Sequence, residues 1–502
     1  MRNQPFFKCV RLCSLLLLAS VRLSHGAVVA GDDFTANTAI AAQALQQWYN
    51  PQGLWDTTGW WNAANCLEAI ENAIVANNGG VYLDVLKKTF DRNSAKNFLN
   101  EYYDDEGWWA LAWMRAYDLT GEARYLDMAK IIFSDMQTGW DDHCGGGIWW
   151  KKERRYKNAI ANELFLLVAV RLHQRTVGPA ESTPYLDWAL KEWRWFQHSG
   201  MINASKLVND GLNRDCENNG RTTWTYNQGV LIGGLTELYR ATGDTNYLHE
   251  AVAIADASIA TLVDTNAILS EPAEREHGGG RDVPQFKGIF IRYLAQLYDV
   301  TRRPEYFNFL LRNARSVWAS NRDASNHFGL RWSGPVDAVD AARHSSAMMA
   351  VSALAEPVLQ DAGAGAGGSW MAGNLKHDLG QLHGLNAWIA DPVETKVSGN
   401  LVSGARTEAL PVGNYVATFE LKVDNFNRDD SKVATLSVVE LESGRLVASR
   451  EVSRQEFSTT LYQTFPVRFQ AVANKRYEFR TFWHYAPHAA RLTQRSLMLQ
   501  TE

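Results

Sequence analysis

The segment YDLTGEARYLDMA, Tyr117 to Ala129, decides the fold because it recurs along the chain. A close copy, YRATGDTNYLHEA, spans Tyr239 to Ala251, and a weaker one, YDVTRRPEYFNFL, spans Tyr298 to Leu310. In each copy the pattern indicates an apolar helix that ends, a polar turn, and a second helix that begins near a tyrosine. The sequence therefore predicts a repeated helical hairpin.

The spacing of the copies predicts how many hairpins there are. The copies start at residues 117, 239 and 298, so the first interval is about twice the second and leaves room for one more copy. Lys157–Thr176 has the position and the helical periodicity of that missing inner helix, and Trp60–Val75 and Arg343–Val358 complete a set of six. Six such hairpins close into an all-α (α/α)6 toroid, which we place at residues 27–360.

A change of composition separates this helical part from the rest of the chain. The stretch DAGAGAGGS is typical of a flexible linker, which we place at residues 361–368. Beyond it, segments such as YVATFELKV and YEFRTFW alternate apolar and polar residues between turn signals. A helix over residues 371–385 is an alternative for the first part, but three glycines in that stretch weaken it. We therefore predict an all-β sandwich at residues 369–502.

The first 26 residues have the pattern of a secretory signal peptide. Three basic residues precede an apolar run from Leu12 to Ala19, and small residues surround Gly26. A membrane anchor fits less well, because the apolar run is too short to span a bilayer. The C-terminal residues also lack the hydrophobic tail of a lipid-anchor signal. We expect a secreted, extracellular monomer without a membrane anchor.

Three cysteines follow the predicted signal peptide, and they allow one disulfide. Cys144 and Cys216 both lie in loops rich in Gly or Asn, whereas Cys66 lies in a helical pattern, so we expect the bond between the first two. No CxxC pair or histidine cluster accompanies them, so neither a metal site nor a cofactor is predicted. Asn203 begins a glycosylation sequon, Asn-Ala-Ser.

Composition narrows the class of ligand. The chain has 19 Trp residues and 11% aromatic residues, and indole rings in this number fill a core or line a cleft for a ligand with flat apolar faces. The net charge is -5, and residues 1–26 contain four basic and no acidic residues, so the remainder carries -9. An acidic chain without a basic cluster argues against nucleic acid and against an anionic membrane surface. A neutral polysaccharide fits both the charge and the aromatic content.

Two consecutive carboxylates carry the chemical prediction. Asp104 and Asp105, in YYDDEGWWAL, lie just before a periodic helix and among aromatic residues. One of them could simply cap the helix. Paired carboxylates among aromatic rings are, however, what a glycosidase needs, one to protonate the leaving oxygen and one to attack or to activate water. Rival or supporting charges nearby are Glu106, Asp141 and Asp142.

At these motifs the sequence resembles a known family, glycoside hydrolase family 76, the endo-α-1,6-mannanases, which fold as (α/α)6 toroids. The matching motifs occur in order between residues 60 and 294: WWNAAN (Trp60–Asn65), YYDDEGWWAL (Tyr102–Leu111), CGGGIWW (Cys144–Trp150), WTYNQG (Trp224–Gly229) and FKGIFIRYL (Phe286–Leu294). The resemblance implies a secreted retaining endo-α-1,6-mannosidase that hydrolyses the α-1,6-mannose backbone of cell-wall mannan. It also implies that Asp104 is the nucleophile and Asp105 the general acid/base.

Other polar and aromatic residues of these motifs are candidates for sugar binding. Amide side chains both donate and accept hydrogen bonds and so suit neutral sugar hydroxyls, and aromatic faces can stack on sugar rings. The predicted substrate-binding residues are Trp61, Asn62, Asn65, Tyr226, Asn227, Gln228 and Lys287. The alternative for each amide is a structural role in holding a loop, and for Lys287 it is an ion pair.

The C-terminal sandwich resembles modules appended to secreted glycoside hydrolases. It is therefore a candidate carbohydrate-binding module, and a purely structural appendage is the alternative. Its candidate sugar contacts are Trp388, Trp483, His484 and Tyr485. For the whole protein two other functions stay open, a cell-wall transglycosylase of the same fold and a non-catalytic mannan-binding protein.

Overall fold

The computed structural model describes residues 33–502 except residues 177, 276–279, 356–368, 384–386, 427–428 and 487–488. The predicted signal peptide (1–26) and the predicted linker (361–368) lie outside the described residues.

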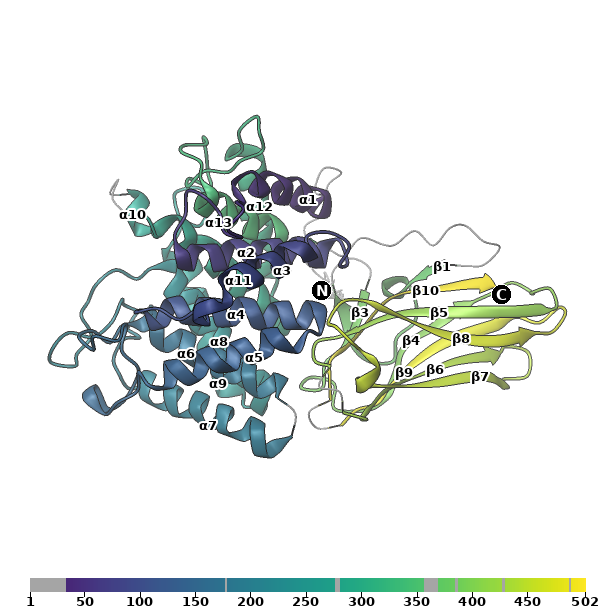
Figure 1. Ribbon diagram of the computed structural model, residues 1–502. Coiled ribbons are helices and arrows are strands. Elements are labelled where there is room, and N and C mark those ends of the chain that lie inside the picture. The colour runs from purple at the N-terminus through teal and green to yellow at the C-terminus, as the bar shows by residue number, and fades with distance from the viewer. Residues whose placement is uncertain are drawn as a thin grey trace, which may run out of the picture. The chain divides into compact units, whose positions relative to one another are not determined.

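Helices make up the first part of the described chain (Figure 1). They are α1 (Phe34–Leu45), α2 (Trp60–Ala76), α3 (Leu83–Asn93), α4 (Tyr103–Thr120), α5 (Ala123–Gln137), α6 (Ala159–Arg175), α7 (Pro179–Phe196), α8 (Thr225–Thr242), α9 (Thr245–Thr261), α10 (Pro272–Arg275), α11 (Val283–Thr301), α12 (Pro304–Ser320) and α13 (Ala341–Ser352).

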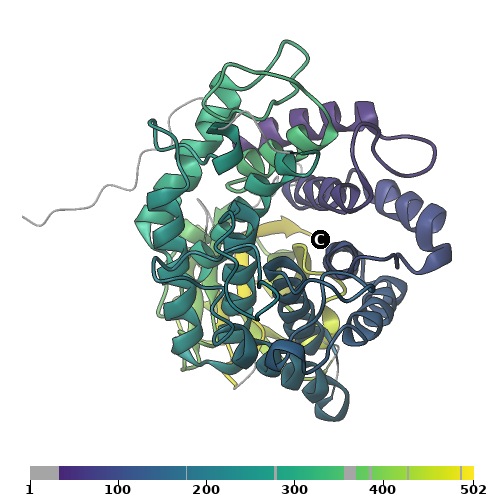
Figure 2. The same cartoon turned by 90° about the vertical axis from the view of Figure 1, so that its left-hand side faces the viewer.

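Six of these helices form a closed inner ring. Going round it, α2 packs on α4, α4 on α6, α6 on α8, α8 on α11, α11 on α13, and α13 returns to α2. Outer helices cover the ring, with α5 on α4, α7 on α6 and α9 on α8. The colours run round this ring in Figure 2. The predicted (α/α)6 toroid is confirmed, and each of the six segments expected to form an inner helix does so.

In the repeated segment of the sequence, the residue that follows the inner helix has a left-handed backbone conformation. Gly121 ends α4 with φ 70° and Gly243 ends α8 with φ 72°, and the next helix follows within two residues. Glycine reaches this region without a steric cost, so it is the common residue just past a helix end. In the weaker third copy Arg302 takes the same conformation, with φ 49°. In these three hairpins the inner helix is thus followed directly by the outer helix that packs on it.

The second part of the described chain is a two-sheet β-sandwich, as predicted. Its strands are β1 (Ser369–Met371), β2 (Gln381–His383), β3 (Ala387–Ala390), β4 (Gly399–Arg406), β5 (Gly413–Val423), β6 (Lys432–Glu440), β7 (Leu446–Ser453), β8 (Gln463–Ala471), β9 (Tyr477–Trp483) and β10 (Leu492–Thr501). One sheet has the order β2-β3-β10-β5-β8, with β1 on β10, and the other has the order β4-β9-β6-β7. All described pairings are antiparallel, and buried residues alternate along β5 and β8.

Loops of the sandwich contact the C-terminal ends of the inner helices. Asn425 Nδ2 donates to the carbonyl oxygen of Gln174 at 2.6 Å, and the Thr460 amide donates to that of Asp118 at 2.8 Å. These carbonyls lie in the last turns of α6 and α4, where no further helical donor follows. The sandwich therefore satisfies acceptors that the ends of the toroid helices leave open.

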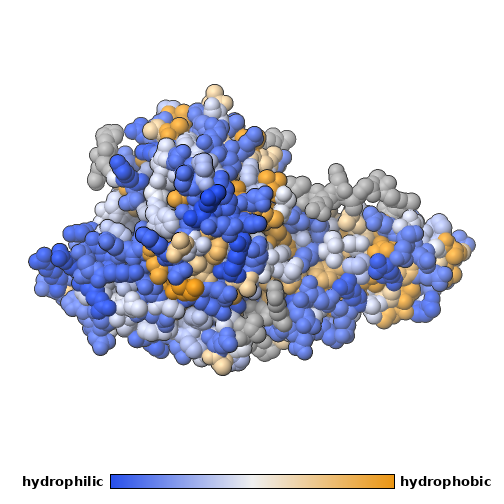
Figure 3. All heavy atoms as spheres, viewed as in Figure 1, coloured by the Kyte–Doolittle hydropathy of each residue, from blue (hydrophilic) through white to orange (hydrophobic). Residues whose placement is uncertain are grey.

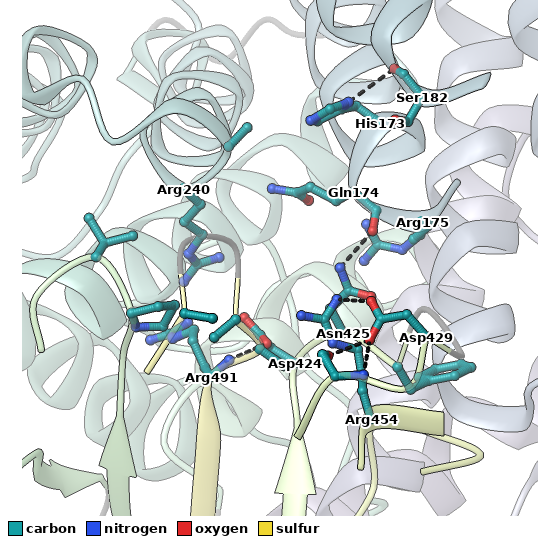
Figure 4. Close-up of a pocket in the computed structure, with 18 of the residues that line it drawn as sticks. His173, Gln174, Arg175, Ser182, Arg240, Asp424, Asn425, Asp429, Arg454 and Arg491 are labelled. Carbon is teal, nitrogen blue, oxygen red and sulfur yellow. Dashed lines mark hydrogen bonds and ion pairs between the residues drawn. The ribbon is translucent and has the colours of Figure 1, made fainter. Parts of the chain in front are cut away.

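A polar cavity of about 730 Å³ lies beside these contacts (Figure 4). Ion pairs line it, including Arg175 with Asp118 at 2.5 Å and Arg491 with Asp391 at 2.7 Å. Asp118 follows Asp104 by fourteen residues along α4, or about 21 Å at 1.5 Å per residue. This cavity is therefore remote from the carboxylate pair.

Among the described residues, no helix is both long enough and apolar enough to cross a membrane. On the face of the molecule shown in Figure 3, the toroid surface is mainly hydrophilic, with scattered apolar residues.

Candidate active site

Asp104 and Asp105 lie inside the first turn of α4, whereas the sequence predicts them just before the helix. The residue that precedes the helix is Tyr102, in extended conformation and without a side-chain cap. Successive helical residues point about 100° apart, so the two carboxylates leave the helix in different directions. The positive end of the helix dipole favours negative charge at both positions.

Asp104 accepts hydrogen bonds on both of its oxygens. Trp150 Nε1 donates to Oδ2 at 3.0 Å, and the Asp105 amide donates to Oδ1 at 3.0 Å. Backbone hydrogen bonds fix Trp150 in this place, because its carbonyl accepts from Tyr103 and its amide donates to Tyr156. Both donors stabilise the ionised form of this carboxylate.

Asp105 has a different environment. Asn100 Nδ2 donates to its Oδ2 at 2.6 Å, and Asn100 Oδ1 in turn accepts from the Tyr102 amide at 2.7 Å. The second oxygen of Asp105 accepts none of the hydrogen bonds found among the described residues, so it has room for a proton.

Burial and the charges of neighbouring carboxylates raise the pKa values of both Asp104 and Asp105. Burial raises the pKa of Asp105 to about 6, against the hydrogen bond from Asn100, and the charge of Asp282 raises it further. The pKa of Asp104 is also raised, first by burial and then by the charge of Asp105, while the Trp150 bond lowers it. Two neighbouring carboxylates that both resist ionisation hold one proton between them in mildly acidic solution.

Aromatic rings from four inner helices lie beside the pair. Trp61 of α2 stacks on Trp108 of α4 with centroids 5.6 Å apart and on Phe286 of α11 at 6.2 Å. Phe286 in turn stacks on Tyr226 of α8 at 4.0 Å. We call these four residues the aromatic floor. Trp61 and Tyr226 are its partly exposed members, whereas Trp108 and Phe286 are buried.

Two of the three rival carboxylates, Glu106 and Asp141, are bonded to lysines. Glu106 is fully buried and pairs with Lys152 at 3.0 Å, and burial raises its pKa to about 8. Asp141 accepts from Lys157 Nζ at 2.9 Å and from Trp149 Nε1 at 2.6 Å. The Lys157 ammonium also donates to three backbone carbonyls between residues 143 and 147, so it organises the loop that leads to Trp150.

A model of the glycosyl hydrolase family 76 domain matches residues 34–365, about two thirds of the chain. This chain belongs to glycosyl hydrolase family 76. The match covers the whole toroid and the carboxylate pair, and it ends before the described strands of the sandwich begin.

Curated proteins with assigned activities are similar to this family 76 chain. The mannan endo-1,6-alpha-mannosidase DFG5 of Saccharomyces cerevisiae is 28% identical over 261 residues, which are 47% of this chain and 56% of that protein. The mannan endo-1,6-alpha-mannosidase DCW1 of Candida glabrata is 27% identical over 333 residues, 59% of this chain and 73% of that protein. Four of the curated relatives are matched over only 56–65% of their own length.

Solved structures are also similar to the toroid of this chain. The alpha-1,6-mannanase GH76A of Salegentibacter sp. HEL1_6 has a TM-score of 0.58 and 26% identity, and the match covers 64% of this chain and 98% of that one. An inactive variant of that enzyme, changed at two consecutive aspartates, was solved with alpha-1,6-mannotriose; it has a TM-score of 0.57 and 25% identity, over 64% of this chain and 98% of that one.

Three of the predicted substrate-binding residues in this family 76 toroid are bonded to other parts of the protein. Asn65 is buried, and its Oδ1 accepts from Arg292. Gln228 is buried, and its amide bonds both backbone groups of Val208. Lys287 is buried, and its Nζ donates to the Leu330 carbonyl at 2.6 Å and pairs with Glu274 at 2.7 Å. These bonds within the protein favour the structural alternative for all three, and direct contact with a sugar stays a prediction.

The other predicted residues lie in the aromatic floor or next to it in the chain. Trp61 and Tyr226 are the partly exposed rings of the aromatic floor. Asn62 is 2% exposed and accepts from the Gly59 amide, which makes it part of the cap of α2. Asn227 is buried, and neither amide atom finds a hydrogen-bond partner within the described chain. A role of Asn62 or Asn227 in binding stays a prediction.

The predicted disulfide is present. Cys144 and Cys216 are bonded and join the loop before Trp150 to the loop after Asp210, while Cys66 is free and buried. His143 lies close to both sulfurs, but sulfurs in a disulfide are not available as metal ligands. Asn203 lies in a turn, and its glycosylation stays a prediction.

The candidate sugar contacts of the sandwich are largely covered. Trp483 is fully buried in the core between the sheets. The Trp388 ring stacks on His377 at 3.5 Å, its Nε1 donates to the Leu379 carbonyl at 2.8 Å, and Tyr485 lines the polar cavity beside the toroid. His484 bonds Thr435. These positions do not form an exposed flat platform.

Sequence reasoning missed three residues of the site, Trp150, Asn100 and Asp282. Trp150 is the last residue of the CGGGIWW motif, but nothing in that motif predicts its contact with Asp104. Asn100 lies four residues before Asp104, and its short amide suits a turn that leads into a helix, which is a signal that could have identified it.

Proposed function

We propose that the protein is a retaining endo-α-1,6-mannosidase that hydrolyses the backbone of cell-wall mannan, with Asp104 as nucleophile and Asp105 as general acid/base. The observation that carries this proposal is the pair of consecutive carboxylates in the first turn of α4, both with a raised pKa, beside the aromatic floor. The relatives support the substrate, since those proteins are mannan endo-1,6-alpha-mannosidases and an alpha-1,6-mannanase. The inactive variant of the latter, changed at two consecutive aspartates, supports the choice of residues.

The reaction divides between the two carboxylates. In the first step an oxygen of Asp104 forms a bond to the anomeric carbon, the glycosidic C–O bond breaks, and the proton of Asp105 moves to the leaving oxygen. In the second step Asp105 takes a proton from water, the water oxygen bonds to the anomeric carbon, and the bond to Asp104 breaks. Two inversions at one carbon give net retention.

Hydrogen bonding supports this order of roles. Asp104 accepts on both oxygens, which suits the charged form that a nucleophile needs. Asp105 keeps one oxygen open, and the charge of Asp282 opposes its ionisation, which suits an acid that must keep its proton until the leaving group departs. Once Asp104 is esterified its charge is gone, so Asp105 ionises more readily and can serve as base.

The rest of the site suits a neutral sugar. Trp61 and Tyr226 offer aromatic faces beside the carboxylates, and Lys151 and Lys152, which follow Trp150 in the chain, pair with Glu153 and Glu106. A mannan backbone has hydroxyls and apolar faces without charge, so it needs no free cation. Secretion, which the pattern of residues 1–26 favours, would bring the protein to its substrate.

Conservative variants test the proposal. Asp104→Asn and Asp105→Asn keep the size of each side chain and remove its acid–base and nucleophilic chemistry. We expect each variant to lose at least about a thousandfold in turnover of linear α-1,6-mannan while keeping the melting temperature within a few degrees. Near-normal turnover by either folded variant would show that its assigned role is wrong.

A further inference from the structure

We propose that Asp282 is a positioning residue of this active site, which fixes the Trp61 ring in the aromatic floor and places a negative charge beside Asp105. The inference rests on the proposed function, because it assigns Asp282 a part in the same reaction.

The first step is the position of Asp282 in the ring of helices. Asp282 directly precedes α11, and Trp61 is the second residue of α2. In the inner ring α13 stands between these two helices. Trp61 Nε1 nevertheless donates to Asp282 Oδ1 at 2.8 Å. This hydrogen bond therefore links two inner helices that are not neighbours in the ring order. It lies at the end of the toroid where the carboxylate pair lies.

The second step is what the bond does to the Trp61 ring. The ring is partly exposed, and it stacks on Trp108 at 28° and on Phe286 at 29° between ring planes. Stacking limits the tilt of the ring, and a hydrogen bond at its nitrogen also limits rotation about its own axis. Phe286 lies four residues after Asp282, so the same helix start supplies the acceptor and one stacking partner. A ring held in this way loses little freedom when a sugar binds.

The third step is electrostatic. The groups that act on Asp105 come from several elements: Asp104 from its own helix, Asn100 from the preceding loop, and Asp282 from the start of α11. Lys151 and Lys152, which follow Trp150 in the chain, pair with Glu153 and Glu106. The charge of Asp282 therefore makes it harder for Asp105 to lose its proton, and the pKa of Asp105 is raised accordingly.

Two substitutions of Asp282 separate the hydrogen bond from the charge. Asp282→Asn keeps an acceptor oxygen for Trp61 and removes the charge, whereas Asp282→Ala removes both. A third variant, Trp61→Phe, removes the donor and keeps both an aromatic ring and the Asp282 charge. Each is compared with the unchanged full-length protein by kcat and KM on linear α-1,6-mannan over the pH range, and by melting temperature.

We expect Asp282→Asn to move the alkaline limb of kcat/KM to lower pH by about half a unit, with KM within twofold of normal. Asp282→Ala should show the same movement together with a KM raised about three- to tenfold. Trp61→Phe should raise KM and leave the alkaline limb in place. An alkaline limb that stays unmoved in Asp282→Asn, or a normal KM in folded Asp282→Ala, would overturn the inference while the proposed function stands. If the unchanged protein does not cleave the mannan, the proposed function fails, and the role of Asp282 in it fails as well.

Discussion

Replacing Trp150 by Phe tests whether Asp104 works as the ionised member of the pair. The substitution removes the Nε1 donor that lies 3.0 Å from Asp104 Oδ2 and keeps a ring in the same place. Because this bond stabilises the charged carboxylate, its loss raises the pKa of Asp104 still further.

The size of the effect follows from the strength of the bond. A hydrogen bond to a charged group contributes about 1.5–3 kcal/mol, and Trp150 is only partly buried, so the lower end applies. At about 1.4 kcal/mol per pKa unit this amounts to a shift of about one unit. The acid limb of kcat/KM should therefore move to higher pH by about one unit. At pH values below the acid limb, kcat/KM of the variant should be about tenfold lower than that of the unchanged protein.

Initial rates of reducing-sugar release from linear α-1,6-mannan between about pH 3 and pH 8 measure this shift. The adjacent Trp149 provides a matched control, because its Nε1 donates to Asp141 instead of to the catalytic pair. Trp149→Phe should leave the limb where it is. An acid limb of Trp150→Phe that stays in place or moves to lower pH would refute the role given to Asp104.

Three further predictions concern stability. Replacing Cys144 and Cys216 by Ser removes a bond that closes 72 residues, worth about 4 kcal/mol in the loop-entropy model, so the melting temperature should fall by several degrees; an unchanged value in calorimetry would contradict this. Arg491→Met leaves Asp391 buried without its partner, so it should destabilise the protein by about 3 kcal/mol in denaturant unfolding yet leave kcat/KM of the folded protein normal; an equal midpoint would show that the pair contributes little. Burial raises the pKa of Glu271 to about 8. Between about pH 4 and pH 8 the native state therefore holds a proton that the unfolded state has lost. Stability present below about pH 4 is then lost as the pH rises toward 8, and Glu271→Gln should show a smaller fall in melting temperature between pH 5 and pH 9 than the unchanged protein; an equal or larger fall would count against this pKa.

Much of the fold could be predicted because its signals are local. The six inner helices carry an apolar pattern of helical period, and the turn of each clear hairpin shows a glycine after the helix end. The sandwich is visible as period-two alternation, for example in Gly413–Val423. In both cases the residues that decide the structure are neighbours along the chain.

The site could be predicted only in part, because its supports come from distant segments. Asp104 and Asp105 are adjacent and stand in one motif. The polar character of Asn65 alone could not show that its side chain accepts a hydrogen bond from Arg292, which lies 227 residues away along the chain. The bond between Trp61 and Asp282 spans 221 residues and depends on the closure of the ring.

The central claim is that Asp104 and Asp105 cleave α-1,6-mannosidic bonds with retention. Proton NMR of the unchanged protein with linear α-1,6-mannan, recorded before the products mutarotate, tests it most directly. We predict that the α-anomer of the new reducing end forms first and that Asp104→Asn forms neither anomer at a comparable rate. A first product in the β-anomer, or no cleavage by the unchanged protein, would contradict the claim.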